Sequence, residues 1–171
     1  MRRTLVAVAI GLPVIASSLM AATGTDGVQT RLQADNLAVV ARGEIVYQAH
    51  CASCHGVQLE GQPNWRQRNA QGRLPAPPHD ASGHTWHHAD DLLFEITKFG
   101  PGVVIGDTSY LSDMPAYANI LNDAEIVAVL SFIKNTWPDN ERQWQEEVNG
   151  TQIDWQLPET DKPSLLDKLL K

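Results

Sequence analysis

The chain has 171 residues, which fits one domain of ordinary size with appendages at its ends. Its composition, 43% hydrophobic and 19% charged, excludes the fibrous and wholly disordered classes. Thirteen basic residues against 20 acidic ones give a formal net charge of −7, and this acidic balance argues against nucleic acid as a partner.

Residues 1–24 have the layout of a secretory signal peptide. Arg2 and Arg3 precede an apolar stretch over residues 5–16, and small residues follow as far as Gly24. An uncleaved anchor is the alternative, because the apolar segment approaches the length of about 20 residues that crosses a bilayer. Pro13 favours cleavage. In both cases we expect an exported protein, in a bacterial periplasm, with membrane association if the segment stays attached.

The first predicted helix covers residues 35–50, after a polar linker at residues 25–34. Asp35 or Asn36 is expected to cap it, and Gly43 is expected to mark a close crossing with another helix. Its apolar residues are Leu37, Val40, Ile45 and Tyr47.

The segment Cys51-Ala52-Ser53-Cys54-His55 contains the only two cysteines of the chain. Two thiols at this spacing can add to the two vinyl groups on one edge of haem, while the imidazole of the next residue binds the iron. We therefore expect one covalent c-type haem. A thioredoxin-like dithiol would need a strand-to-helix setting, and a structural zinc site would need four ligands.

Residues 58–78 lack periodicity and contain several glycines and prolines, which predicts a long loop. Loops of this length usually have a functional reason, and wrapping a flat cofactor supplies one. Arg66, Arg68 and Arg73 form the one basic concentration here. They are interpreted either as a solvated surface or as partners of haem propionates or of an acidic protein.

Four histidines follow within ten residues, at positions 79, 84, 87 and 88. The favoured interpretation of the segment His79 to His88 is a polar loop over the haem edge. Two alternatives stay open: hydrogen bonds to propionates or surface groups together with Trp86, and a separate metal site built on His84, His87 and His88.

Two further helices are predicted at residues 89–99 and 122–137. The first has an apolar stripe of Leu92, Leu93, Ile96 and Phe99, and Gly100-Pro101 stops it. The second opens with the capping box Asn122-x-x-Glu125. Its apolar stripe is Ile126, Val129, Leu130, Ile133 and Trp137.

Residues 138–171 form a polar C-terminal extension. It is predicted to contain a short helix at residues 144–148 and a leucine-rich segment at residues 164–171, which covers part of the core or docks a partner. The sequence has no internal repeat, which excludes a duplicated two-haem protein.

Over residues 35–137 the order of helix, haem motif, loop, helix, loop with a methionine, and helix resembles the class I c-type cytochromes with one haem. The resemblance implies an all-α fold of three main helices, with long loops wrapped around one covalent haem c. Cys51 and Cys54 fall on the thioether positions and His55 on the proximal axial position. Pro77 matches the proline whose carbonyl oxygen receives the other N–H of that histidine.

The resemblance also covers the helix crossing, where Gly43, Tyr47 and Phe132 match the glycine and the paired aromatic residues of the family. It departs from the family at His79, where a leucine is common.

Met114 is the expected distal ligand. Met1 and Met20 lie in the expected signal, and Met114-Pro115 resembles the distal-ligand loop of the family. Iron held by His55 and Met114 has no open position for a substrate, which favours an electron carrier over an enzyme.

The expected function is to carry single electrons between respiratory or dehydrogenase partners. Without Arg2 and Arg3 the basic residues number 11 against 20 acidic ones, a charge of about −9 before the propionates. Such a protein is expected to meet partners through a basic patch on them, or through an apolar haem edge. Two alternatives are an enzyme or sensor that binds peroxide or a diatomic gas after Met114 detaches, and a metal-handling module that uses the His79 to His88 segment.

Overall fold

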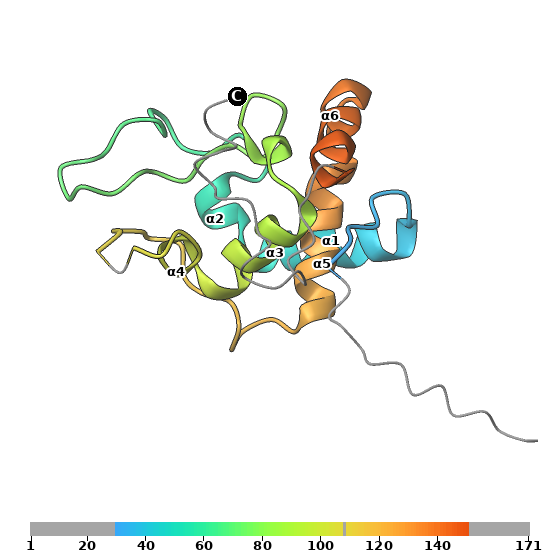
Figure 1. The fold of residues 1–171 in the computed structure, drawn as a ribbon, viewed down its shortest axis with the longest axis horizontal. Helices are drawn as coiled ribbons and strands as arrows, with labels where there is room; N and C mark the ends of the chain where they lie inside the picture. Colours follow the sequence, from blue (N-terminus) through green and yellow to red (C-terminus); the bar gives the residue numbers. More distant parts are fainter. Residues whose placement is uncertain (1–29, 108, 151–171) are drawn as a thin grey trace, which may run out of the picture.

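The computed structural model describes residues 30–107 and 109–150, and every regular element in them is helical (Figure 1). The elements are α1 (Leu37–His50), α2 (Ala52–His55), the short 3₁₀ helix η1 (Thr85–His87), α3 (Asp90–Phe99), α4 (Pro101–Val104), α5 (Asp123–Asn135) and α6 (Asp139–Gly150). The all-α prediction is confirmed. None of the described helices is long and apolar enough to cross a membrane. The expectations for the signal segment and for residues 164–171 lie outside the described residues.

The predicted crossing of the first and last main helices is confirmed at Gly43, where α1 passes over α5 (Figure 1). A Cβ atom placed on Gly43 would lie 2.0 Å from the carbonyl oxygen of Ala128. The rings of Tyr47 and Phe132 pack beside this contact, with their centroids 5.5 Å apart. The backbones of the two helices therefore touch at a position where only glycine fits.

The buried face of α1 differs from the predicted one. Gly43, Val46 and Tyr47 are buried, whereas the side chains of Leu37 and Ile45 are 76% and 64% exposed. Successive helical residues are about 100° apart, so Ile45 lies about 200° around the axis from Gly43. The close approach at Gly43 fixes which face turns inward, and it leaves Leu37 and Ile45 toward solvent.

Helix α5 agrees with its prediction. The side chain of Asn122 accepts from the backbone N–H of Glu125, and the Glu125 side chain accepts from the backbone N–H of Asn122, which completes the capping box. All five residues of the predicted stripe are buried: Ile126, Val129, Leu130, Ile133 and Trp137.

Helix α3 begins at Asp90, one residue later than predicted. Leu93, Phe94 and Thr97 are buried, but Phe99 is 44% exposed, so its place in the buried stripe was predicted wrongly. Phe99 is the last residue of the helix, beyond the turn that packs on the core. Gly100 then takes φ 84°, and Pro101 opens α4 instead of ending helical structure.

Helix α6 is longer than the short helix predicted at residues 144–148, because polar contacts rather than an apolar stripe hold it. Gln145 is fully buried and donates through Nε2 to Asp90 Oδ1 at 2.5 Å. The ammonium of Lys134, on α5, lies 2.5 Å from Glu146 Oε1 and 3.7 Å from Asp90 Oδ1.

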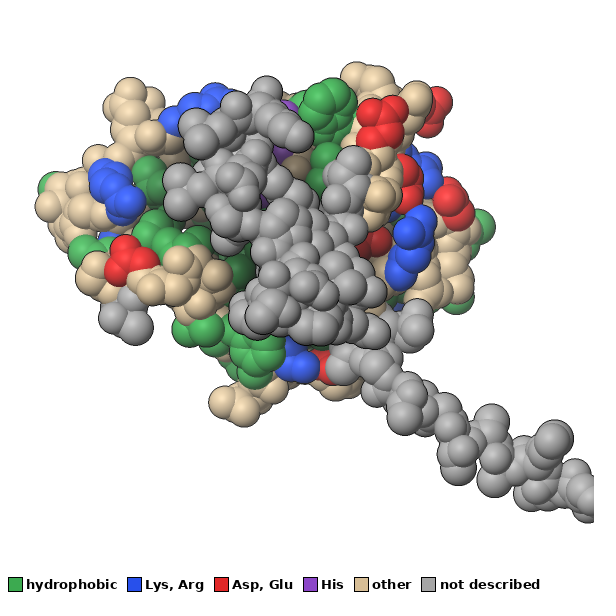
Figure 2. Space-filling view, viewed as in Figure 1, with side chains coloured by type: hydrophobic (Ala, Val, Ile, Leu, Met, Phe, Trp, Pro, Cys, Tyr) green, Lys and Arg blue, Asp and Glu red, His purple; other side chains and the backbone are tan. Residues whose placement is uncertain are grey.

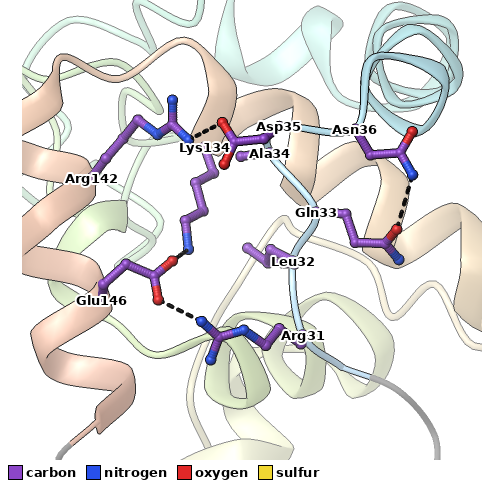
Figure 3. A pocket seen from close by; sticks show the side chains of 9 residues that line it. All are labelled: Arg31, Leu32, Gln33, Ala34, Asp35, Asn36, Lys134, Arg142 and Glu146. Carbon is purple, nitrogen blue, oxygen red and sulfur yellow. Dashed lines mark hydrogen bonds and ion pairs between the residues drawn. The ribbon is translucent and has the colours of Figure 1, made fainter.

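The N-terminal segment of the described chain packs beside α5 and α6. Leu32 and Ala34 are buried, and the backbone N–H of Leu32 donates to Asp90 Oδ2 at 2.9 Å. The hollow between these elements has a volume of about 330 Å³ (Figure 3). Its charged side chains pair with one another across it, since Arg31 and Lys134 both contact Glu146, and Arg142 contacts Asp35.

Residues 58–78 form the predicted loop, which projects from the body of the molecule (Figure 1). Two backbone hydrogen bonds join its outgoing and returning arms, from Gln62 N to Ala76 O and from Asn69 N to Arg73 O. We call it the arginine loop.

Candidate functional site

The cysteine–histidine segment lies where α1 passes into α2. Cys51 N donates to Tyr47 O at 2.8 Å, and His55 N donates to Cys51 O at 2.9 Å, so the segment continues the helical hydrogen bonding of α1. Gly56 ends it with φ 84°, and the hydroxyl of Tyr47 donates to Gly56 O. The two cysteines and the histidine therefore lie within one fixed turn.

Both cysteines are free thiols. Cys51 is half-buried against the core and Cys54 is exposed. Burial, followed by the neighbouring Cys54, raises the pKa of Cys51 to about 11, which keeps this thiol protonated near neutral pH. Two unpaired thiols three residues apart in one turn suit double attachment to a single planar group.

The ring of His55 is buried and held at one nitrogen. Its Nδ1 lies 2.9 Å from the carbonyl oxygen of Pro77. A carbonyl oxygen only accepts, so Nδ1 carries the hydrogen and donates it. Burial lowers the pKa of His55, while the bond to Pro77 opposes that change. The neutral ring is thus left with a free lone pair on Nε2, the form in which imidazole binds iron.

The segment that contains Pro77 is clamped against the haem-motif turn. Gly61 N donates to His55 O at 2.8 Å, and a Cβ atom on Gly61 would lie 2.4 Å from Pro78 N. Gly61 also has φ 67°, in the region that favours glycine. The arginine loop thus leaves and returns at His55.

Met114 lies in the loop between α4 and α5. It is half-buried and packs against the same core cluster as Cys51. The loop is tied down next to it, because the hydroxyl of Tyr117 donates to His50 O at 2.8 Å and Tyr117 N donates to Thr97 O. Burial, followed by Cys51 and Cys54, raises the pKa of Tyr117 to about 12. Tyr117 therefore joins the methionine loop to the turn that holds the two thiols.

His79 separates from the other histidines of its segment. Its ring stacks on the ring of His55, with the centroids 4.0 Å apart and the planes 22° from parallel. Its Nδ1 is joined to Thr85 Oγ1 by a hydrogen bond of 2.8 Å. The sequence marked His79 as a departure from the family, but no local pattern indicates the stack, which depends on how the arginine loop folds back.

Two of the remaining histidines stack on indoles, His84 on Trp65 at 5.2 Å and His87 on Trp86 at 3.7 Å, whereas the ring of His88 meets that of His84 edge-on, with centroids 5.3 Å apart. Within residues 30–107 and 109–150, no group of three or more His, Cys, Asp or Glu side chains is placed to hold a metal ion.

The three arginines of the loop have different kinds of partner. Arg73 pairs with Asp113, whereas Arg66 lies over the Trp65 ring at 4.0 Å and Arg68 donates to Gly72 O. Among the lysines and arginines that the structure describes, Arg66 and Arg68 are the two without a carboxylate partner. In Figure 2 basic side chains are visible at the left, together with an acidic one, whereas acidic and basic side chains lie together at the right.

Comparison with known proteins gives one match. The family model Cytochrome c matches residues 40–137, more than half of the chain. The matched region includes the turn of Cys51, Cys54 and His55, the loop of Met114 and the whole of α5. No curated protein and no solved structure matches the chain.

Proposed function

This chain belongs to the cytochrome c family and carries covalently attached haem c, and we propose that it is an exported carrier of single electrons. In the proposal Cys51 and Cys54 form the two thioether bonds, and His55 and Met114 are the axial ligands of the iron. The haem supplies a reversible one-electron couple, and the protein supplies attachment, ligation and burial.

The ring of His55 is the observation that carries the proposal. It is buried, it follows the second cysteine directly, and its Nδ1–H is committed to Pro77 O. This hydrogen bond fixes the tautomer and supports the basicity of Nε2, as second-shell partners of ligating histidines do. A merely structural histidine would not need this arrangement beside two free thiols.

Met114 supports transfer of electrons rather than chemistry on a substrate. A thioether is a soft ligand that favours ferrous iron, so it raises the potential above that of a bis-histidine haem. With His55 and Met114 both bound to it, the iron would have no open site for peroxide or a diatomic gas. The hydrogen bonds of Tyr117 to His50 O and Thr97 O hold the loop that carries Met114 in place.

The partners are redox proteins. We propose a dehydrogenase or quinol-oxidising complex as the donor and a terminal oxidase or reductase as the acceptor, in the periplasm. The signal-like N-terminus supports this location, since Arg2 and Arg3 precede an apolar segment. The acidic charge of the chain argues against nucleic acid.

An optical spectrum combined with a redox titration of the purified holoprotein tests this function. We expect a low-spin oxidised form with the weak near-infrared band of sulfur-to-iron charge transfer, and one single-electron wave. A high-spin oxidised form without that band would contradict the carrier and favour the enzyme or sensor. Two waves would contradict a single haem.

A further inference from the structure

The stack between His79 and His55 has no part in attachment or ligation as proposed above. Two imidazoles lie face to face at 4.0 Å, and one of them is the expected iron ligand. The hydrogen bond to Pro77 O constrains His55 at a single atom, Nδ1. One such bond leaves the ring plane free to swing about the line of the bond, whereas a flat ring packed on its face does not.

His79 is itself held on several sides, so it can act as a fixed surface. The hydrogen bond between His79 Nδ1 and Thr85 Oγ1 sets its ring, and Thr85 is buried. Its backbone N–H donates to Leu59 O, and its carbonyl accepts from Trp137 Nε1, both at 2.8 Å. The ring of Tyr47 packs edge-on against that of His79, with the two centroids 6.5 Å apart.

The two rings meet face to face, because their planes lie only 22° from parallel. The leucine common in the family would not supply such a flat face.

We propose that His79 is a positioning residue for His55, whose ring plane it fixes. The inference rests on the proposed function in taking His55 as an iron ligand. The plane of an iron-bound imidazole sets the orientation of the iron orbitals, so a change of that plane is visible in the g values of the ferric form.

The test compares three variants of the holoprotein by electron paramagnetic resonance of the ferric form. His79→Leu removes the stack, so we expect changed g values. His79→Phe restores a flat ring, so we expect g values near those of the wild type. Thr85→Val frees the His79 ring, and the g values should move in the direction seen with His79→Leu, by less.

His87→Leu is the matched control, because His87 is exposed, stacks on Trp86 and has no contact with His55. We expect it to keep the g values of the wild type. Unchanged g values in His79→Leu, or equal shifts in His87→Leu, would overturn the proposal. Should His79→Leu fail to mature with haem, unshifted g values in Thr85→Val overturn it by themselves.

Failure of the proposed function would look different. A wild type that is not low-spin, or that keeps its spectrum when His55 is replaced, would remove His55 as a ligand. A low-spin wild type with unshifted His79 variants would refute the positioning role alone.

Discussion

Gly43 shows how one residue sets the geometry of the core. Its Cα faces the carbonyl of Ala128 so closely that no side chain can enter, and the rings of Tyr47 and Phe132 pack alongside. The crossing brings α1 onto α5, and α1 leads directly into the turn of Cys51. The position of the turn of Cys51 therefore depends on a residue without a side chain.

Gly43→Leu is predicted to destabilise the protein by more than the about 1–3 kcal/mol of ordinary overpacking, because the obstacle is backbone. Denaturant unfolding of the holoprotein measures the change. Glu44→Leu, one residue along on the exposed side, is the control and should stay within about 0.5 kcal/mol of the wild type. Unchanged stability in Gly43→Leu would mean that α1 and α5 do not approach at this point.

The two thiols give the second prediction at this scale. Acid–acetone extraction of the denatured wild type should leave the haem on the chain, because thioether bonds survive it. Cys51→Ser with Cys54→Ser should yield apoprotein. Complete extraction of haem from the wild type would show that the thiols of this turn are not its attachment.

At the scale of elements, α6 is attached by buried polar contacts. Lys134 lies between Asp90 and Glu146, and Gln145 on α6 donates a hydrogen bond to Asp90. Lys134, Asp90 and Gln145 are all buried. Buried charges of this kind are costly to leave unpaired, so the contacts stabilise the docked helix strongly only while all of them are present.

Lys134→Met should therefore lower the free energy of unfolding by about 3 kcal/mol, because Asp90 stays buried without its cation. Arg31→Gln removes an exposed partner of the same Glu146 and should cost at most about 1 kcal/mol. Chemical denaturation of the two variants and the wild type compares these values. Equal losses of unfolding free energy in both variants would show that the buried contacts of Lys134 stabilise the protein no more than the exposed ion pair of Arg31.

The elements also show what the sequence could predict. The capping box and stripe of α5 are local patterns, and both are present as predicted. The inward face of α1 follows from its contact with α5, so Leu37 and Ile45 were misplaced. The docking of α6 depends on Asp90, far back along the chain, and the stack of His79 depends on His55, on the other side of the arginine loop. The periodicity of a sequence segment does not indicate such long-range contacts.

For the whole molecule, charge is distributed unevenly. The chain is acidic overall, yet Arg66 and Arg68 lie without carboxylate partners on the arginine loop, which begins and ends beside the proximal histidine. At the opposite side of the view in Figure 2, acidic side chains lie among basic ones. An anionic and a cationic redox reagent can therefore show which charge governs electron exchange. It is either the net negative charge of the whole protein or the positive charge of the arginine loop.

Oxidation of the reduced protein by ferricyanide, an anion, should speed up as ionic strength rises, because salt screens the repulsion by the net negative charge. Oxidation by a cationic cobalt phenanthroline complex should slow down. Stopped-flow kinetics at several salt concentrations measures both. A ferricyanide rate that falls with salt, and that drops in Arg66→Gln with Arg68→Gln, would contradict this prediction and place electron exchange at the arginine loop.

The central claim is that His55 and Met114 fill both axial positions of a single haem, and exposure of the reduced protein to carbon monoxide tests it most directly. The wild type should keep its spectrum under the gas, because the thioether occupies the sixth position. Met114→Ala should bind carbon monoxide at once. A wild type that binds it readily would contradict the electron carrier and support the ligand-binding alternative.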